Sequence, residues 1–307
     1  SLSIAMEGAD RPRTQFVNMK PKKIISGYSD KQSVAPGEKI EFKVSVEDDT
    51  DEYLCNIVRL FSTDGHALGP GLIESAVSSP VNRSYPSRRQ HIYPGSYIRI
   101  PNMPVLQSFT LQAWIWPTLI GAVEQTIIAK GLGLAMNLNK KGALVLKLDK
   151  QQFTTDIPLL ERIWTFIAVS YDAPNGTIRL VQLPKKNYPS IETSSDCSFS
   201  SATNYQFDGD VTLAAQGLDH TTMAHHFNGK IDRPRIANHA LKKYEMMALG
   251  EINPPDNLAD KIVASWDLSR EASSDRIVDV SNNDHHGFTT NLPARSMTGH
   301  NWSGDVT

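Results

Sequence analysis

The stretch FTLQAWIWP, from Phe109 to Pro117, decides the fold of this chain. Apolar residues recur at every second position, which is the period of a β-strand that buries one face. Pro117 ends the pattern, because proline has no backbone N–H to donate to a neighbouring strand. We expect the regular apolar face to lie in the core between two sheets. That face carries Phe109, Leu111, Ala113 and Ile115.

The opposite face of the same strand carries Trp114 and Trp116, where water would normally lie. Either another layer of chain covers the two indole rings, or the rings line a groove. An exposed aromatic platform could stack on sugar rings, but burial is the commoner fate of such a face. We expect a covering layer, and we keep Trp114 and Trp116 as the candidate ligand-binding residues.

Further strands follow at short intervals along the chain. Residues 134–138 and 144–148 flank the turn sequence NKKG, and residues 164–171 and 177–183 flank DAPNG. Each pair predicts an antiparallel hairpin. Only residues 241–249 have a helical pattern, as one short turn after the strands. Many strands without intervening helices predict an all-β sandwich.

The first part of the chain predicts a smaller β region. Residues 40–46 alternate between apolar and charged side chains, and a second strand pattern covers residues 53–61 after an acidic turn. These two strands indicate the beginning of a small immunoglobulin-like sandwich. Residues 1–22 are polar and aperiodic, and we expect them to form an N-terminal arm.

Composition excludes several classes of protein. The 307 residues are 40% hydrophobic and 21% charged, enough to build a sizeable core. A net charge of −2 argues against binding to nucleic acid, which needs a dense positive surface. No apolar run approaches the ~20 residues that cross a bilayer, and no signal peptide is visible. With only Cys55 and Cys197, and Cys55 expected as a buried thiol, we expect a cytoplasmic protein.

Three segments resemble the laminin-G-like and concanavalin A-like jelly rolls, and they occur in the order typical of that fold. They are FTLQAWIWP at 109–117, IWTFIAVSYD at 163–172 and FNGKID at 227–232. The usual opening strand of such domains is found late, in the segment that holds Trp266, Ile277 and Val278. We therefore expect this late segment to supply strands of the jelly roll.

Four more segments carry a second resemblance that spans nearly the whole chain. They are GYSDKQSVAPG at 27–37, IVRL at 57–60, GPG at 69–71 and NLPARSMTGHNW at 291–302. Together they resemble the N-terminal part of the N,N-dimethylformamidase large (β) subunit family. The resemblance implies a parent amidohydrolase that acts on linear amides, with its active site and mononuclear iron in a further C-terminal catalytic domain.

The resemblance also implies an organisation for this chain. We expect an N-terminal arm at 1–22, a small β-sandwich at 23–85 and a jelly roll at 86–250. Residues 251–307 would hold the closing strands and the linker to the missing catalytic domain. The segment would be a non-catalytic scaffold without a cofactor of its own, and its partners would be the catalytic domain and other subunits. The alternatives are a carbohydrate-binding module that recognises glycans, and an enzyme with an unrecognised site.

No stretch of the sequence contains a complete catalytic motif. The patterns Gly-x-Ser-x-Gly and His-Glu-x-x-His are absent. Asp219, His220 and His225 could supply the three protein ligands of a zinc or iron centre. We interpret them as polar loop residues.

Calcium is the better-motivated ion for this chain. Jelly rolls of the group that the chain resembles often hold Ca²⁺ at the rim of the sandwich, and Ca²⁺ takes carboxylate, amide and backbone oxygens. The candidate ligands are Asp208, Asp210, Asp279, Asn282 and Asn283.

Overall fold

The chain divides into two compact units, Ser1–Pro94 and Gly95–Thr307. Of the expected arm at 1–22, only the strand Leu2–Ala5 lies within the described residues, and His220 lies outside them. No described helix is long and apolar enough to cross a membrane. The computed structural model describes residues 2–5, 25–47, 50–64, 66, 68–89, 95–185, 192–201, 204–219, 222–295 and 299–300.

The first unit consists of antiparallel strands in two small sheets. The long strand β4 pairs with β1, β5 and β6, whereas β2 and β3 form a separate two-stranded ribbon. Both strands expected in this region form, as β3 and β4, and they belong to different sheets. The strands are β1 (Leu2–Ala5), β2 (Ile25–Ser29), β3 (Phe42–Val46), β4 (Glu52–Asp64), β5 (Gly71–Ala76) and β6 (Arg83–Pro86).

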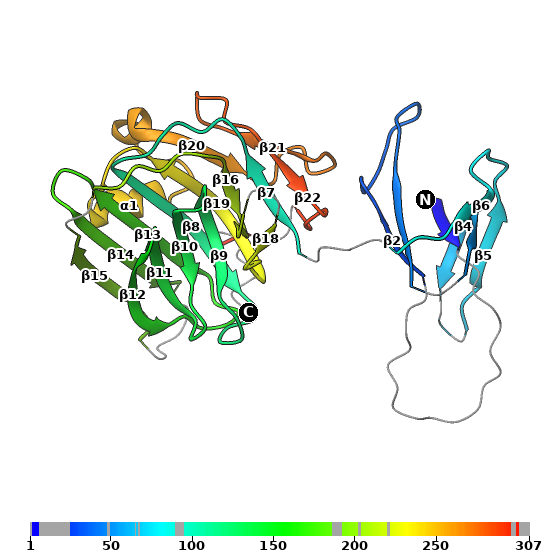
Figure 1. Cartoon of the computed structure of the whole chain (residues 1–307), viewed down its shortest axis with the longest axis horizontal. Helices are drawn as coiled ribbons and strands as arrows, with labels where there is room; N and C mark the ends of the chain where they lie inside the picture. Colours follow the sequence, from blue (N-terminus) through cyan, green and yellow to red (C-terminus); the bar gives the residue numbers. More distant parts are fainter. Residues whose placement is uncertain are drawn as a thin grey trace. The chain divides into compact units, whose positions relative to one another are not determined.

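The second unit is one continuous 14-stranded antiparallel sheet that folds over into a sandwich (Figure 1). Its strand order is β12-β11-β10-β9-β16-β7-β22-β21-β20-β19-β8-β13-β14-β15. Both expected hairpins are confirmed, as β10–β11 and β13–β14. The strands are β7 (Tyr97–Ile100), β8 (Phe109–Pro117), β9 (Gln125–Lys130), β10 (Leu134–Leu138), β11 (Ala143–Leu148), β12 (Gln151–Pro158), β13 (Thr165–Asp172), β14 (Thr177–Pro184), β15 (Ser195–Ser200), β16 (Val211–Leu213), β19 (Gly229–Ala237), β20 (Ile262–Asp267), β21 (Arg276–Asp279) and β22 (Gly287–Thr290).

Three smaller elements complete the second unit. The ribbon β17 (Gln216–Gly217) and β18 (Met223–Ala224) stands apart from the large sheet. The helix α1 (Lys243–Leu249) and the 3₁₀ helix η1 (Asp256–Lys261) follow β19. The helix lies where the sequence predicts the single helical turn.

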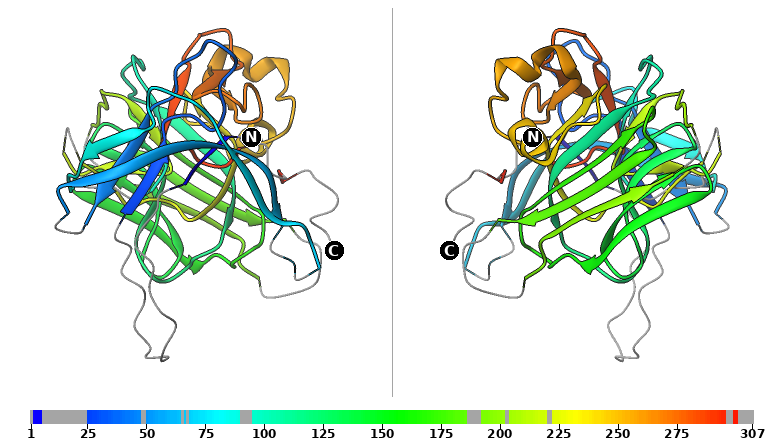
Figure 2. Two further views of the ribbon diagram at one scale, coloured as in Figure 1. Left: turned by 90° about the vertical axis from the view of Figure 1, so that its right-hand side faces the viewer. Right: turned by 90° about the vertical axis from the view of Figure 1, so that its left-hand side faces the viewer.

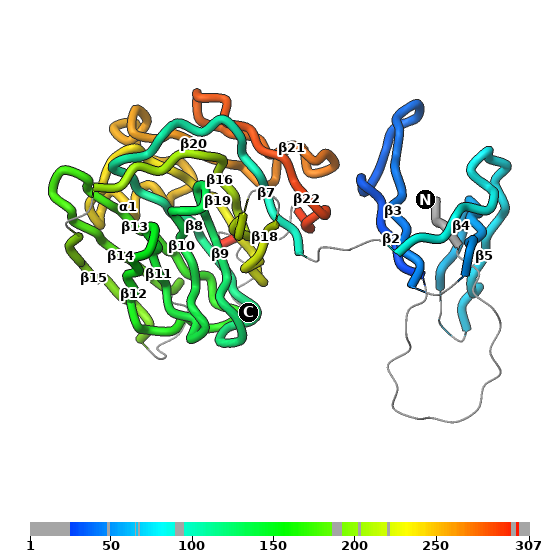
Figure 3. Tube along the Cα trace, viewed as in Figure 1, coloured from blue at the N-terminus to red at the C-terminus, as the bar shows by residue number. Residues whose placement is uncertain are grey.

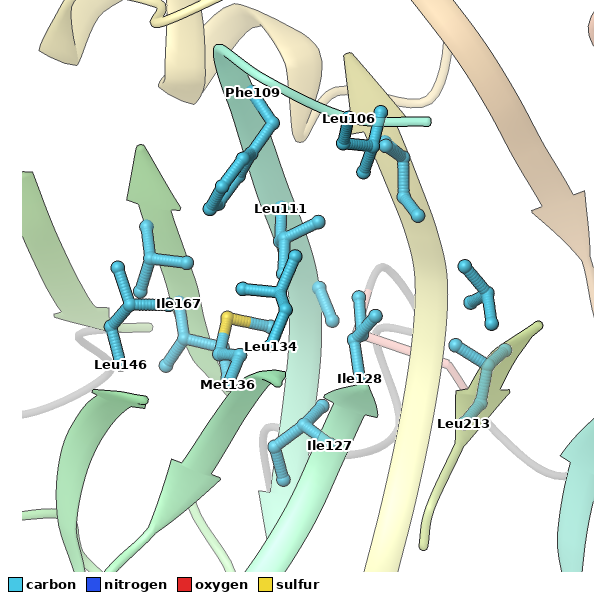
Figure 4. Packing of buried hydrophobic residues seen from close by; sticks show 14 of the residues in the cluster. Leu106, Phe109, Leu111, Ile127, Ile128, Leu134, Met136, Leu146, Ile167 and Leu213 are labelled. Atoms are coloured by element: carbon cyan, nitrogen blue, oxygen red, sulfur yellow. The ribbon is translucent and has the colours of Figure 1, made fainter. Parts of the chain in front are cut away.

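The core lies between the two halves of the folded sheet. All four residues of the expected buried face of β8 are fully buried. Figure 4 shows Phe109 and Leu111 of β8 beside Ile167 of β13, packed against Met136 of β10 and Leu146 of β11. Burying a large apolar side chain stabilises a fold by about 1.5–3 kcal/mol. The buried face of β8 therefore contributes to the stability of the sandwich.

The strands from the end of the chain join the two halves. β20 pairs with β19, β21 pairs with β20 and β22, and β22 pairs with β7 near the start of the unit (Figures 1 and 3). Trp266 of β20 is 1% exposed, and its Nε1–H donates to the carbonyl of His285 at 2.8 Å. Trp266, Ile277 and Val278 thus lie in strands of the sandwich, as the sequence predicts.

A second apolar cluster covers the outer face of β13 and β14. Phe166 and Val181 pack there against Met246 and Leu249 of α1. Figure 2 draws the helical segment after β19 in yellow to orange. The guanidinium of Arg235 lies beneath the chain that leaves the helix and donates to the carbonyls of Leu249, Glu251 and Ile252. Burial lowers the pKa of Arg235 to about 10. The sequence does not predict this covering layer in any detail.

Replacing Trp266 with alanine should lower the free energy of unfolding by about 3–5 kcal/mol, because it opens a cavity in the closing strands. Phe288→Ala is the matched control: Phe288 belongs to the same late segment but is 50% exposed. Urea unfolding of both variants and the parent measures the effect. Equal stability of the two variants would contradict a structural role for the late strands.

Candidate functional site

The candidate site lies on the outer face of β8 and β19, around Trp114 and Trp116. In the register of the two strands, Trp116 is opposite Lys230 and Trp114 is opposite Asp232. Residues directly opposite in neighbouring strands point to the same face of a sheet. The pairing therefore places a lysine and a carboxylate beside the two tryptophans.

Trp114 is covered by its own chain. The ring of His300 stacks on the indole with 4.3 Å between centroids and 6° between planes, and Phe166 packs edge-on against the same indole. The Nε1–H donates to the carbonyl of Gly250 at 3.0 Å. The covering layer expected from the sequence thus exists over Trp114, and it comes from residues after β19.

His300 is held in place by the half-buried carboxylate of Asp232. Its Nδ1 lies 2.6 Å from Oδ2 of Asp232, and its backbone N–H donates to the same oxygen at 3.3 Å. Lys185 donates to the carbonyl of His300. Burial acts to raise the pKa of Asp232, but the hydrogen bond and charge of His300 outweigh it and leave this pKa below the ordinary value of 3.8. The carboxylate is thus ionised at neutral pH.

Trp116 is approached by a cation. Nζ of Lys230 lies 4.5 Å from the centroid of the Trp116 ring and 5.9 Å from that of Trp164. An ammonium over an aromatic face is attracted by the negative charge of the π-system. Trp116 is half-buried, whereas Trp164 is only 4% exposed. Trp114 and Trp116, the two residues predicted to bind ligand, are thus both half-buried.

A cavity of about 530 Å³ adjoins this cluster at one end of the sandwich. Its volume is in the range of small-molecule sites. Lys230, Asp232 and Arg295 supply charged groups to the wall, and Nδ1 of His226 is buried without a hydrogen-bond partner in the described part of the chain. The remaining wall is mostly apolar. It includes Tyr97, Ile98, Trp164, Leu213, Phe227, Ile231, Leu268 and Ile277.

The calcium candidates lie in two separate turns. Both oxygens of Asp279 are used inside the turn after β21, where they accept hydrogen bonds from Ser265, Ser281 and His285. The side-chain amide of Asn283 donates to the carbonyls of Ile262 and Val263. Asn282 is exposed. These contacts fold the turn from within.

Asp208 and Asp210 lie in the loop before β16. Asp208 accepts a hydrogen bond from Gly209 at 2.7 Å, and Asp210 forms an ion pair with Arg99 at 2.5 Å. Over residues 25–295, apart from the gaps given above, no three histidine, cysteine, aspartate or glutamate side chains are grouped to hold a metal. Whether calcium binds at any of the candidate ligands stays a prediction.

Asp219 and His225 belong to the loops around β17 and β18. Asp219 accepts a hydrogen bond from Thr222, and His225 has a left-handed backbone with φ of +56°. No sequence pattern indicates the cluster of His300, Lys230 and Asp232 around the tryptophans. Only the register of β8 and β19, together with the path of the chain after β22, brings these residues together.

Comparison with known proteins relates the chain to two groups. Residues 94–246 match the Laminin_G_3 family, the concanavalin A-like lectin/glucanases superfamily. The chain is 31% identical to the N,N-dimethylformamidase beta subunit of Paracoccus aminophilus and 32% identical to that of an Alcaligenes species. Each match covers 91% of this chain and 41% of the relative. The chain therefore spans about two fifths of the length of these relatives.

A solved structure shares the fold. It is a putative carbohydrate binding protein from Bacteroides ovatus, with a TM-score of 0.51 and 15% sequence identity. The match covers 80% of this chain and 69% of that protein. At this level of identity the likeness concerns the fold alone.

Replacing Asp232 with asparagine should lower the free energy of unfolding by about 1–3 kcal/mol at neutral pH, because a charged hydrogen bond is lost. Since the pKa of Asp232 is lowered in the folded state, its stabilisation is present above its unfolded value of 3.8 and is lost as the pH falls through the folded value. The difference between parent and variant should therefore shrink in strong acid.

Urea midpoints measured over a series of pH values test this expectation. Asp260→Asn, at an exposed position, is the control and should follow the parent at every pH. A difference between parent and Asp232→Asn that stays constant through the acid range would show that the carboxylate charge has no part in holding His300.

Proposed function

We propose that this chain, whose residues 94–246 form a domain of the concanavalin A-like lectin/glucanase superfamily, is a non-catalytic scaffold of an amide hydrolase. The observation that carries the proposal is its similarity, over 91% of its length, to subunits named N,N-dimethylformamidase. In this proposal, hydrolysis of a linear amide and the iron that serves it belong to another part of a larger protein.

The geometry of the candidate site supports a packing role. The carboxylate of Asp232 is hydrogen-bonded to the ring of His300, and that ring is stacked on Trp114. An acid–base pair needs access to a substrate proton within hydrogen-bond distance. His300 is only 8% exposed and serves to fasten its own segment to the sheet.

The first unit supports a role in assembly. Several of its large apolar side chains are exposed although the unit itself has few buried ones. Phe61 is 64% exposed, Leu68 is 92% exposed and Leu72 is 67% exposed. Large apolar side chains that are this exposed are available for contact with another protein surface. The relatives are named beta subunits, which supports partner subunits for this chain as well.

The two cysteines support a cytoplasmic location. Cys55 and Cys197 are both free and half-buried, so no disulfide links them. Cys55 is thus less enclosed than the sequence suggested. Unpaired cysteines are typical of proteins in a reducing compartment.

The isolated 307-residue chain should not hydrolyse N,N-dimethylformamide, with or without added Fe²⁺. The expected result follows from the lack of an open acid–base pair in the described site. Release of dimethylamine, measured against a sample without protein, tests it. Turnover that disappears in His225→Ala would contradict a scaffold role.

Assembly can be tested by complementation. We expect the chain to restore activity to a Paracoccus aminophilus beta subunit from which the matching region has been removed. Phe61→Glu should weaken this restoration, because a charge replaces an exposed apolar contact, whereas Glu74→Gln on the neighbouring strand β5 should not. A chain that folds but leaves the truncated subunit inactive would argue against the proposal.

Glycan binding is the second candidate function, and the cavity beside Lys230 favours it. Its wall combines aromatic rings with a few charged groups, as sugar-binding and other small-molecule sites do. In a glycan array, Lys230→Met should then reduce binding and the exposed Lys150→Met should not. If the parent chain binds no glycan on the array, this alternative is excluded.

A further inference from the structure

Lys130 is a charged residue buried at the rim of the sandwich. It is the last residue of β9 and is only 1% exposed. In the register of the sheet it lies between Leu134 of β10 and Val211 of β16, both of which are core residues. A lysine is rarely buried to this extent unless oxygen atoms surround its ammonium group.

Backbone oxygens receive the ammonium. Nζ of Lys130 donates to the carbonyl of Gly209 at 2.7 Å and lies 3.4 Å from the carbonyl of Met103. The loop that contains Gly209 also holds Asp208 and Asp210. The ammonium of Lys130 therefore lies against a loop that contains two aspartates, next to carbonyl oxygens from two different segments.

The loop packs closely on the end of β9. The N–H of Gly131 donates to the carbonyl of Asp210 at 2.9 Å, and a Cβ on Gly131 would lie 2.4 Å from the carbonyl oxygen of Asp208. Gly209 has φ of +97°, which glycine adopts at little cost. These contacts bring the acidic loop onto the strand that carries Lys130.

The charges in the loop favour the ammonium. Burial lowers the pKa of Lys130, and the negative charges of Asp208 and Asp210 act in the opposite direction. Asp210 also forms an ion pair with Arg99, whose side chain is mostly exposed. Asp208 has no cation within ion-pair distance among the described residues. Removing the Lys130 charge would leave the negative charges of Asp208 and Asp210 without the ammonium that offsets them, and would leave two carbonyl oxygens without their donor.

We propose that the ammonium of Lys130 is a built-in cation that takes the place of a divalent metal at this rim. Backbone carbonyl oxygens are among the groups that Ca²⁺ prefers, and here the ammonium already occupies those of Gly209 and Met103. The loop before β16 is thereby held without metal. This inference goes beyond the proposed scaffold role, because it concerns how the module keeps its fold when calcium is scarce.

Thermal unfolding of the whole chain tests the proposal. The Tm of the parent should be the same with millimolar CaCl₂ and with a chelator. Lys130→Met, which keeps the apolar stem but removes the charge, should lower the Tm by about 5 °C or more. Lys150→Met, at an exposed position, should leave it unchanged. A calcium-dependent rise in the parent Tm that Asp208→Asn abolishes would overturn the proposal.

A double-mutant cycle separates the charge of Lys130 from its packing. In the parent, Asp208→Asn should lower the Tm, because the ammonium loses a favourable neighbour. In the Lys130→Met background the same change should leave the Tm unchanged or raise it, because it removes an uncompensated negative charge. An equal fall in both backgrounds would refute an electrostatic role. If Lys130→Met does not fold, its recovery by adding Asp208→Asn supports the proposal and a failure to recover counts against it.

Discussion

The pairing of β19 with β20 and of β22 with β7 is the constraint on which the second unit depends. Without these ladders the folded sheet would have open edges at β7 and β19, and unpaired strand edges are prone to aggregate. The three late strands satisfy both edges and bring Trp266 into the core. In the second unit, the first strand β7 therefore gains its second neighbour only when the last strand, β22, is in place.

Two arginine side chains, one buried and one half-buried, hold irregular segments that this topology creates. Arg295 donates to the carbonyls of Leu268, Ser274 and Arg276 and so closes the connection between β20 and β21. Arg235 does the same for the chain after α1. A guanidinium suits this task because its five N–H donors can satisfy several backbone carbonyls that no sheet or helix reaches. Connections that lack an apolar face are thereby fixed by hydrogen bonds.

The fold could be predicted from the sequence where a pattern is local. The alternation in β8 and the two hairpins follow from residues that are neighbours along the chain, and the late strands follow from a family resemblance. Contacts between distant segments left no such signal. Nothing in QTIIAK, the sequence of β9, indicates that its last residue is buried, and only the loop around Gly209 encloses Lys130. In the same way, nothing near Trp114 indicates that His300 covers it.

The acidic turns show why residue type alone does not identify a metal site. Aspartate and asparagine in a tight turn fit calcium, but they fit equally well the free N–H groups that every tight turn contains. In the turn after β21, Asp279 accepts hydrogen bonds from backbone and hydroxyl donors. At the loop before β16, which holds Asp208 and Asp210, the ammonium of Lys130 supplies the positive charge. The same logic extends to Asp232 and His300, whose residue types suit catalysis but whose atoms are engaged in fastening one segment to the sheet. Several charged side chains in this sandwich, Asp232 and Arg235 among them, thus fasten segments of their own chain.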